Sequence, residues 1–375
     1  MMAKQWLAGA GLMSVLMACS TPMRISPGDA GPGNQGSGAA TSHDAAGGWP
    51  DGGVMSTHVG VGGVEQPFLC VVTRFDTWPT GGSPTALVRG PDGNLWFPED
   101  MANQIARITP AGKITEYKID ASGGLGRIAV GPDGNLWFTF VTGFPSSYAD
   151  VDRITLDGSI TYFRFTTAER RGAANDLAAG PDGNLWITDS SDGVIVRMKA
   201  DGSKDTLEVP TGADPDTIIA GPDGNLWFTA AGHHAIGRMT PVGSLSEFAL
   251  PDHPEPRLTA LAFDASGDLW YTYSGWSTDF VDEGIGRLAS DGTVKEFPLP
   301  GGHVTPWSIV AGPDGNMWFS ENGQGKVGRI TPEGSIDECQ VTRASARLGS
   351  MAVGADNHLW IAEIGAQYID RLEVR

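Results

Sequence analysis

The 375-residue chain is predicted to contain an all-β domain, a seven-bladed β-propeller with four-stranded blades. The first observation is a repeated phrase, Gly-Pro-Asp-Gly-Asn-Leu-Trp in its fullest form, whose tryptophan recurs at intervals of 41 to 49 residues. A period in the forties is typical of propellers and solenoids, in which one supersecondary unit is repeated. The seven tryptophans are Trp96, Trp137, Trp186, Trp227, Trp270, Trp318 and Trp360.

The second observation is that each repeat contains four short apolar segments. In the first repeat, residues 86–88 and 94–97 flank a Pro-Asp-Gly turn, and residues 104–108 and 113–117 flank a second turn. Such turns join antiparallel strands, because Pro fixes φ and Gly accepts a positive φ. Four short strands per unit, without helical periodicity, favour a propeller blade over a parallel β-helix.

The third observation concerns closure of the ring. The last repeat contains a third strand at residues 369–372 but no fourth, whereas residues 71–75, ahead of the first repeat, resemble an outer strand. We expect this N-terminal segment to complete the last blade. Closure of this kind removes the open sheet edges that promote aggregation.

An arginine recurs in the third strand of every repeat. We expect it to pair with the aspartate of the Pro-Asp-Gly turn, because a planar guanidinium suits a carboxylate, and we expect the repeated tryptophan in the core between blades. The turn aspartates include Asp92, Asp133, Asp182, Asp223 and Asp314. The arginines are Arg107, Arg153, Arg197, Arg238, Arg287, Arg329 and Arg371.

The first 66 residues predict an export signal and a linker, which leaves residues 67–375 for the propeller. Within residues 1–18, Lys4 is followed by an apolar run that is too short to span a membrane. The Leu-Met-Ala before Cys19 resembles the lipobox of bacterial lipoproteins, which implies lipidation of Cys19 and a location in the bacterial cell envelope, periplasmic or at the surface. The alternative is an ordinary secretory signal. Residues 19–66, rich in Gly, Ala, Ser and Pro, predict a disordered tether.

Charge and cysteine content restrict the partners. A formal net charge of −19 argues against nucleic acid as a partner. We also expect a monomer that touches the membrane only through its lipid anchor. Beyond Cys19 there are two cysteines, Cys70 and Cys339, and no CxxC metal motif. They fall in predicted outer strands of neighbouring blades, and the sequence leaves a disulfide and two free thiols equally open.

The repeated phrase, with residues 236–241 (Ile-Gly-Arg-Met-Thr-Pro) and the Glu-Phe at 247–248, resembles the streptogramin lyase (virginiamycin B lyase) family. The resemblance extends from about Phe68 to Arg375. It implies linearisation of cyclic depsipeptide antibiotics by elimination at the ester, assisted by Mg²⁺, with a histidine as base. The family's two histidines open inner strands of the last two blades, where this chain has Trp307 and Gly349.

These substitutions shape the expected function. Neither Trp307 nor Gly349 can accept a proton, and Arg347 replaces the acidic residue that precedes the second histidine in the family. We therefore expect binding of a small cyclic peptide or other small ligand. The alternatives are a carbon–oxygen lyase with a rearranged site, and a scaffold that binds another envelope protein.

Candidate site residues lie on the face where the chain enters each inner strand. Glu99, Glu321 and Glu363 follow the tryptophans of three neighbouring blades and are candidate ligands for Mg²⁺ or Ca²⁺, or else solvated or paired with arginines. His303 is the candidate base, or else a solvated loop histidine. The residues expected to line a ligand-binding mouth, unless their loops pack on themselves, are Trp307, Trp276, Tyr273, Phe140, Tyr148 and Arg347.

Overall fold

The computed structural model describes residues 41–44, 70–77, 82–120, 123–142, 149–163, 165, 173–253, 256–275, 283–299 and 304–374. The predicted signal peptide, Cys19 and residues 45–66 of the predicted tether lie outside these ranges. Within them, we find no helix with the length and apolar character needed to cross a membrane.

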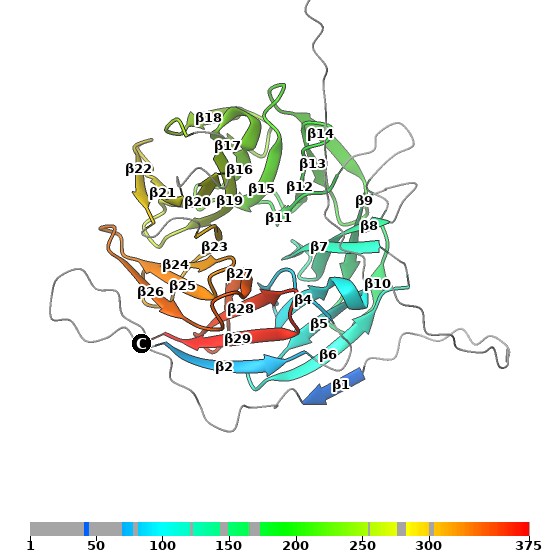
Figure 1. The fold of residues 1–375 in the computed structure, drawn as a ribbon. Coiled ribbons are helices and arrows are strands. Elements are labelled where there is room, and N and C mark those ends of the chain that lie inside the picture. Colours follow the sequence, from blue (N-terminus) through cyan, green and yellow to red (C-terminus); the bar gives the residue numbers. More distant parts are fainter. Residues whose placement is uncertain are drawn as a thin grey trace, which may run out of the picture. The chain divides into compact units, whose positions relative to one another are not determined.

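Seven antiparallel sheets stand around a central axis, which confirms the predicted seven-bladed propeller (Figure 1). Blades 1 to 7 are numbered in chain order by their innermost strands. These strands are β3 (Val88–Arg89), β7 (Gly123–Val130), β11 (Leu177–Ala179), β15 (Pro215–Ala220), β19 (Pro256–Phe263), β23 (Pro306–Ala311) and β27 (Arg347–Val353).

Successive strands of each blade run outward from the axis. The second strands are β4 (Leu95–Glu99), β8 (Leu136–Thr142), β12 (Leu185–Asp189), β16 (Leu226–Ala230), β20 (Leu269–Gly275), β24 (Met317–Glu321) and β28 (Leu359–Ile364). The third strands are β5 (Gln104–Ile108), β9 (Ala149–Ile154), β13 (Val194–Met198), β17 (Ala235–Met239), β21 (Gly284–Leu288), β25 (Lys326–Ile330) and β29 (Tyr368–Glu373). The outer strands are β6 (Lys113–Lys118), β10 (Ile160–Thr161), β14 (Lys204–Glu208), β18 (Leu245–Ala249), β22 (Val294–Pro298), β26 (Ile336–Gln340) and β2 (Val71–Asp76).

The two ends of each blade have different connections. The turn between the first and second strands follows the predicted chemistry: Gly93 has φ of 77°, and the Gly90 amide donates to the Asn94 carbonyl over 2.8 Å. We call the end that carries these turns the turn face. The opposite end, where the chain enters each innermost strand, is the entry face, and it includes the short 3₁₀ helices η1 (Asp100–Ala102) and η2 (Ala231–His233).

The N-terminal strand β2 closes the ring, as predicted. It pairs antiparallel with β29 from Val71 opposite Glu373 to Asp76 opposite Tyr368. A disulfide joins Cys70, just before β2, to Cys339 in β26 of blade 6, with Cα atoms 6.2 Å apart. This settles the question that the sequence left open. Strand β1 (Thr41–Asp44), from the predicted tether, pairs with β6 and adds a fifth strand to blade 1.

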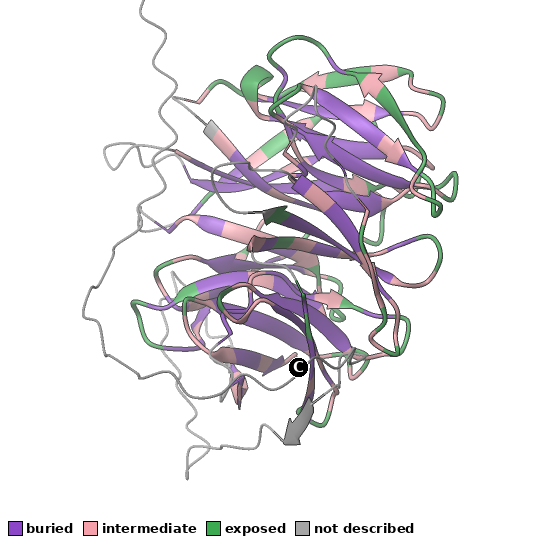
Figure 2. Ribbon diagram, turned by 90° about the vertical axis from the view of Figure 1, so that its right-hand side faces the viewer, coloured by how far each residue is buried: buried purple, intermediate pink, exposed green. Residues whose placement is uncertain are grey.

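The core lies between the blades. Trp96 and Ile105 of blade 1, for example, pack against Leu136 and Phe138 of blade 2, and similar clusters fill the other junctions. Figure 2 shows the strands largely buried and the exposed residues concentrated in turns and outer strands. Burial of large aromatic side chains is the main source of stability in such a ring.

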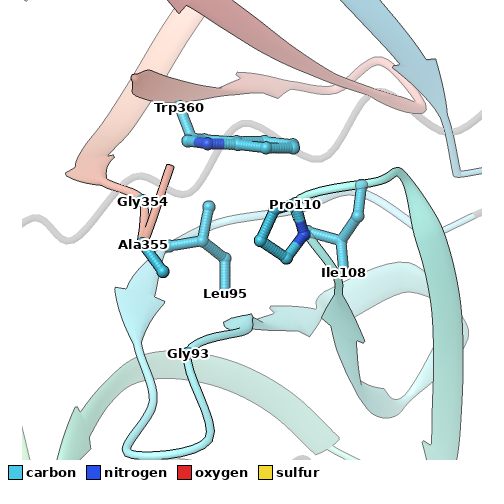
Figure 3. Close-up of a pocket in the computed structure, with 7 residues that line it drawn as sticks. All are labelled: Gly93, Leu95, Ile108, Pro110, Gly354, Ala355 and Trp360. Atoms are coloured by element: carbon cyan, nitrogen blue, oxygen red, sulfur yellow. The ribbon is translucent and has the colours of Figure 1, made fainter. Parts of the chain in front are cut away.

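At the closing junction, the turn face of blade 1 packs on blade 7 (Figure 3). Leu95, Ile108 and Pro110 meet Gly354, Ala355 and Trp360, and the hollow they line has no room for a water-sized molecule. Phe75 of β2 stacks on Trp360 with ring centroids 5.0 Å apart. The junction is therefore filled by packing.

The predicted arginine–aspartate pairs are present near the turn face. In blade 1, Arg107 lies 3.3 Å from Asp92, and Arg153, Arg197, Arg287, Arg329 and Arg371 also approach an aspartate within 4 Å. The same aspartate accepts the indole N–H of the repeated tryptophan, over 3.1 Å from Trp96. In blade 4, Arg238 interacts electrostatically with Asp223. This repeated unit is structural, because six blades share it, and blade 5 divides it between two aspartates, with Trp270 bonded to Asp264 and Arg287 near Asp268.

Candidate functional site

Side chains that differ from blade to blade meet at the entry-face ends of the innermost strands. A β-bulge interrupts five of these strands at the same point, between Pro306 and Ser308 in β23 and between Leu348 and Met351 in β27, for example. A bulge leaves one residue out of the ladder and redirects its side chain. We call this region the mouth, and its described members are Arg127, Asn175, Asp176, Asp216, Arg257, Trp307 and Arg347.

Trp307 occupies the bulge of β23 and is partly exposed. The guanidinium of Arg257, near the start of β19, lies 5.2 Å from the centroid of the Trp307 ring. A cation over an indole face is favourable by about 0.5–2 kcal/mol, depending on solvent exposure. The pair therefore presents an aromatic surface with an adjacent positive charge.

The backbone before Trp307 is held in an uncommon conformation. Thr305 has φ of 45°, in the left-handed region that disfavours β-branched residues. The amides of Val304 and Thr305 donate to the buried carboxylate of Glu283, and the Asn322 amide donates to the Thr305 carbonyl over 3.1 Å. These contacts from blades 5 and 6 fix the position of Trp307.

Blade 7 forms the other side of Trp307. Arg347 is exposed, and its backbone is bridged to Asn322. Gly349 is buried, and a Cβ at this position would lie 2.6 Å from the Ile364 side chain, so packing favours glycine here. The Ser320 hydroxyl donates to the Gly349 carbonyl over 2.7 Å, which ties blade 6 to blade 7 below the mouth.

The half of the mouth formed by blades 2 to 4 is acidic, and sequence reasoning missed it. Burial raises the pKa of Asp176 to about 6 against the opposing effect of Arg127, and Asp176 accepts the Ile218 amide over 3.1 Å. Asn175 donates to Asp216 over 3.3 Å. The signal was available, because these residues precede the apolar run of their inner strands just as Trp307 does.

The structure does not gather Glu99, Glu321 and Glu363 at the mouth. Glu99 and Glu321 end their second strands and Glu363 is the last residue but one of its strand. At these positions the alternation of side chains turns each toward the preceding blade, away from the axis. Glu99 lies against Gly82 in the connection from blade 7, and burial raises its pKa to about 7 against the hydrogen bond from Gln104. Burial also raises the pKa of Glu321, to about 8, with the charge of Glu338 adding to the effect.

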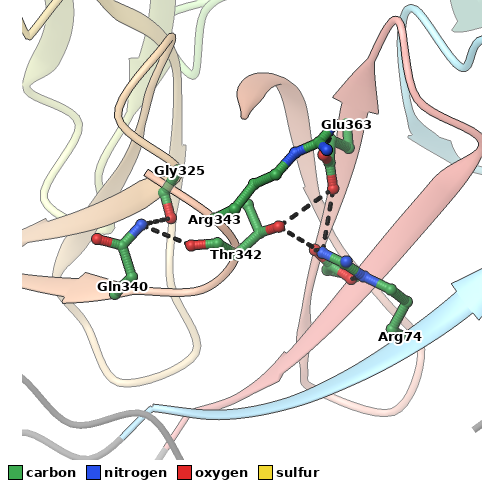
Figure 4. Close-up of polar contacts among 7 residues, drawn as sticks. Arg74, Gly325, Gln340, Thr342, Arg343 and Glu363 are labelled. Atoms are coloured by element: carbon green, nitrogen blue, oxygen red, sulfur yellow. Dashed lines mark hydrogen bonds and ion pairs between the residues drawn. The ribbon is translucent and has the colours of Figure 1, made fainter. Parts of the chain in front are cut away.

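Glu363 is the carboxylate at the junction of blades 6 and 7 (Figure 4). It is buried and accepts hydrogen bonds from Arg74, over 3.0 Å, and from the Thr342 hydroxyl, over 3.4 Å. Arg343, largely exposed, approaches its other oxygen to 3.9 Å. Arg74 also donates two hydrogen bonds to Asp370. Glu363 is therefore part of a buried network of ion pairs and is not a solvated carboxylate.

These surroundings do not fit the Mg²⁺ ion that the family resemblance implies. Mg²⁺ is bound through carboxylate oxygens and water, whereas the oxygens of Glu363 face two guanidinium groups. Among the residues that the structure describes, no cluster of three or more His, Cys, Asp or Glu side chains is arranged to hold a metal. We derive no step through a metal.

The remaining candidates are placed as follows. Phe140 is buried in the core between blades 1 and 2, and Tyr273 is buried between blades 4 and 5, where it stacks on His253 with centroids 4.8 Å apart. Both positions face a neighbouring blade for the same geometric reason as the glutamates. His303, Trp276 and Tyr148 lie outside the described residues.

Comparison with known proteins agrees with this fold and with its seven repeats. The model of the virginiamycin B lyase family matches residues 68–172 and 165–375. The chain belongs to the virginiamycin B lyase family. No curated protein sequence matches it.

Three solved structures show how the chain relates to other members of the virginiamycin B lyase family. Virginiamycin B lyase from Staphylococcus aureus is 27% identical, with a TM-score of 0.70 over 82% of this chain and 100% of that one. A catalytically inactive histidine-to-alanine variant of that enzyme, solved with quinupristin, gives the same values. A streptogramin B lyase is 25% identical, with a TM-score of 0.71 over 82% of this chain and 98% of the other.

Proposed function

We propose that this member of the virginiamycin B lyase family binds a small cyclic peptide or other small ligand at its mouth. In this proposal the ring of a bound cyclic peptide is not opened. The observation that supports binding is Trp307, a partly exposed indole in a bulge, flanked by Arg257. An aromatic surface with a few polar groups at the end of a propeller axis is a common form of ligand site.

The proposal of binding without catalysis rests on the family resemblance. The positions that correspond to the two catalytic histidines are Trp307 and Gly349, which have no group able to take a proton. Arg347 stands where the family has an acid, and Glu363 is engaged by Arg74. A general base must lie within hydrogen-bonding reach of the proton it removes, and the described mouth offers no histidine for this.

The proposed location is the bacterial cell envelope, with Cys19 lipidated. The disulfide between Cys70 and Cys339 supports an oxidising compartment, where such bonds persist.

The test is to titrate the full-length protein with streptogramin B depsipeptides by calorimetry and to analyse the mixture by mass spectrometry. We expect binding and an intact ring, with affinity at least tenfold weaker in Trp307→Ala. Tyr162→Ala, which changes an exposed aromatic on the rim of blade 2, is the matched control. Binding that is equally strong in Trp307→Ala would refute the mouth as the site.

The alternative is a lyase with a rearranged site, which membership of the family and the 27% identity to the Staphylococcus aureus enzyme favour. It predicts linear product in the same experiment, lost when EDTA removes divalent ions. It also predicts that His303→Ala abolishes turnover. Ring opening at many turnovers per protein would replace our proposal with this one.

A further inference from the structure

We propose that the mouth selects ligands carrying a carboxylate beside an aromatic or apolar group, with Arg257 and Arg347 binding the carboxylate and Trp307 the apolar part. This inference rests on the proposed binding function and narrows its ligand class. Two kinds of molecule carry a carboxylate beside an aromatic or apolar group: a free aromatic acid and the C-terminal residue of a linear peptide.

The two arginines come from the blades on either side of Trp307. Arg257 belongs to β19 of blade 5, and its guanidinium is 5.2 Å from the ring centroid of Trp307. Arg347 begins β27 of blade 7 and is exposed. Its backbone bridges to Asn322, whose amide bonds the Thr305 carbonyl over 3.1 Å, so Arg347 lies one strand away from the segment that carries Trp307.

Carboxyl groups near this side of the mouth carry less negative charge than their number suggests. Glu363 is paired with Arg74 at 3.0 Å, and Glu338 with Lys326 at 2.8 Å. Glu321 is fully buried, and the neighbouring Glu338 carboxyl adds to the effect of burial on its pKa. A carboxyl in that setting favours its neutral form, in line with its raised pKa of about 8.

One acid on this side keeps hydrogen bonds suited to the charged form. Glu283 accepts hydrogen bonds from the amides of Val304 and Thr305, in the backbone segment that supports Trp307. Arg343, with a side chain 73% exposed, adds a further cation beside Glu363. Among the described charged side chains, the guanidinium of Arg257 contacts the Trp307 ring.

The opposite half of the mouth has the reverse character. The charge of Asp216 contributes to the raised pKa of Asp176, and Asn175 donates to Asp216. Asp216 would repel a ligand carboxylate there, and the charge of Arg127 is already offset by Asp176, which favours binding of the carboxylate toward blades 5 to 7. Because the whole chain has a net charge of −19, an anion needs such local guanidinium contacts to bind, and these are the groups best suited to bidentate carboxylate binding.

The experiment compares matched ligands that differ only in charge. N-acetyl-L-phenylalanine and its uncharged amide are titrated into the full-length protein by calorimetry at low ionic strength. The same is done with a short linear peptide ending in phenylalanine, its C-terminal amide, and the corresponding cyclic peptide, which has no terminal carboxylate. A preference for the peptide acid over the acetylated amino acid would identify a peptide C-terminus as the source, and the reverse would identify a free acid.

We expect each acid to bind at least tenfold more tightly than its amide, because charge-assisted hydrogen bonds are about twice as strong as neutral ones. The preference should fall to about twofold or less in Arg347→Gln, whose exposed side chain is not needed for folding, and in Arg257→Gln. Arg89→Gln, an exposed arginine at the turn-face end of β3, is the matched control and should keep the full preference. Raising the salt concentration should weaken binding of the acids more than of the amides.

Two outcomes separate this inference from the function on which it rests. Equal affinity for acid and amide, or an unchanged preference in both arginine variants, would overturn the carboxylate assignment, while a loss of affinity in Trp307→Ala would leave the binding function standing. Absence of binding by every acid, amide and cyclic peptide would overturn both.

Discussion

The two faces of the propeller treat carboxyl groups in opposite ways, at four turn aspartates on one face and at Glu99 and Glu321 on the other. At the turn face, burial raises the pKa of Asp133, but hydrogen bonds from Asn135 and Trp137 outweigh it and hold the pKa below its usual value. Asp182, Asp223 and Asp264 behave alike. At the entry face, burial prevails and raises the pKa of Glu99 to about 7 and of Glu321 to about 8.

The difference shows what determines whether a buried carboxyl stays ionised. The donors to Asp133 come from the same repeat, two and four residues along the chain, and the copies at Asp182 and Asp223 carry the same pair. The donors to Asp264 in blade 5 also come from its own repeat, two and six residues along. Donors at the entry face come from a third strand, an outer strand or another blade, and each blade has its own set. The repeated end is therefore structural, whereas the variable end is free to acquire a function.

The largest effect should come from cutting the covalent closure that both ends depend on. The two cysteines are 269 positions apart, and the chain-entropy model for such a long loop gives about 5 kcal/mol. The double variant Cys70→Ser, Cys339→Ser should lose stability on this scale in guanidinium denaturation. A reducing agent should have the same effect on the unaltered protein and none on the variant, and an unchanged unfolding midpoint would contradict the prediction.

The repeated end can be broken at one aspartate. Asp182→Ala removes the acceptor of the Trp186 indole N–H and of Asn184 and the partner of Arg197, so we expect a loss of about 2–3 kcal/mol. Asp314→Ala should cost the same within about 1 kcal/mol, since its blade copies these contacts. Asp201→Ala, which removes only the exposed hydrogen bonds from Ser203, should cost less than either variant. Unequal losses in the two blades would mean that the unit is not modular.

The carboxyl groups at the entry face should make the protein less stable as the pH rises, whereas those at the turn face should make it more stable. A carboxyl whose folded pKa is raised binds more protons in the folded state, so stability falls as pH rises from about 4.5 through about 8. Glu321→Gln should stabilise the protein by about 1–2 kcal/mol at pH 9 and leave it nearly unchanged at pH 5. The measurement is guanidinium denaturation across this pH range, with Glu373→Gln as the control.

At the turn face the sign reverses. The lowered pKa of Asp133 stabilises the folded state above pH 3.8, and this stabilisation is lost as the pH falls through the folded value. A protein whose stability rose steadily between pH 5 and pH 9 would show that the two ends do not differ in this way.

The smallest predicted effect tests backbone strain at the mouth. Thr305→Gly should stabilise the fold by about 0.5–1 kcal/mol, because glycine accepts the φ of 45° that a β-branched residue resists. Asn357→Gly, at φ of 58° in the last blade, should be close to neutral, since asparagine already tolerates this region. Destabilisation by Thr305→Gly would show that the threonine side chain, and not its strain, determines the effect.

Much of the fold could be predicted from the chain. The repeated turn residues define the strands, the repeated tryptophan counts the blades, and the pairing of β2 with β29 follows from a fourth strand missing at one end. The pairs of Arg107 with Asp92 and of Arg153 with Asp133 were likewise predicted, since seven copies of one pattern indicate a structural role.

The site was less predictable. Position along the sequence shows that Glu99, Glu321 and Glu363 lie at the same end of neighbouring blades. It does not show the direction in which each side chain points. The pleat of the strand turns them toward the preceding blade. Asp176 and Asp216, in the acidic half of the mouth, hold nearly the same position before their inner strands as Trp307, but the residue type there differs from blade to blade, so position alone does not reveal a charge.

By itself the sequence determined a ring of seven four-stranded blades and the contacts within each repeat, because turn chemistry and strand alternation act over a few residues. Only the tertiary structure decided which charges meet. Arg74 reaches Glu363 from 289 positions away, and the disulfide joins residues 269 positions apart. Such partners depend on how neighbouring blades pack, and that packing determines which carboxyls are paired with arginines.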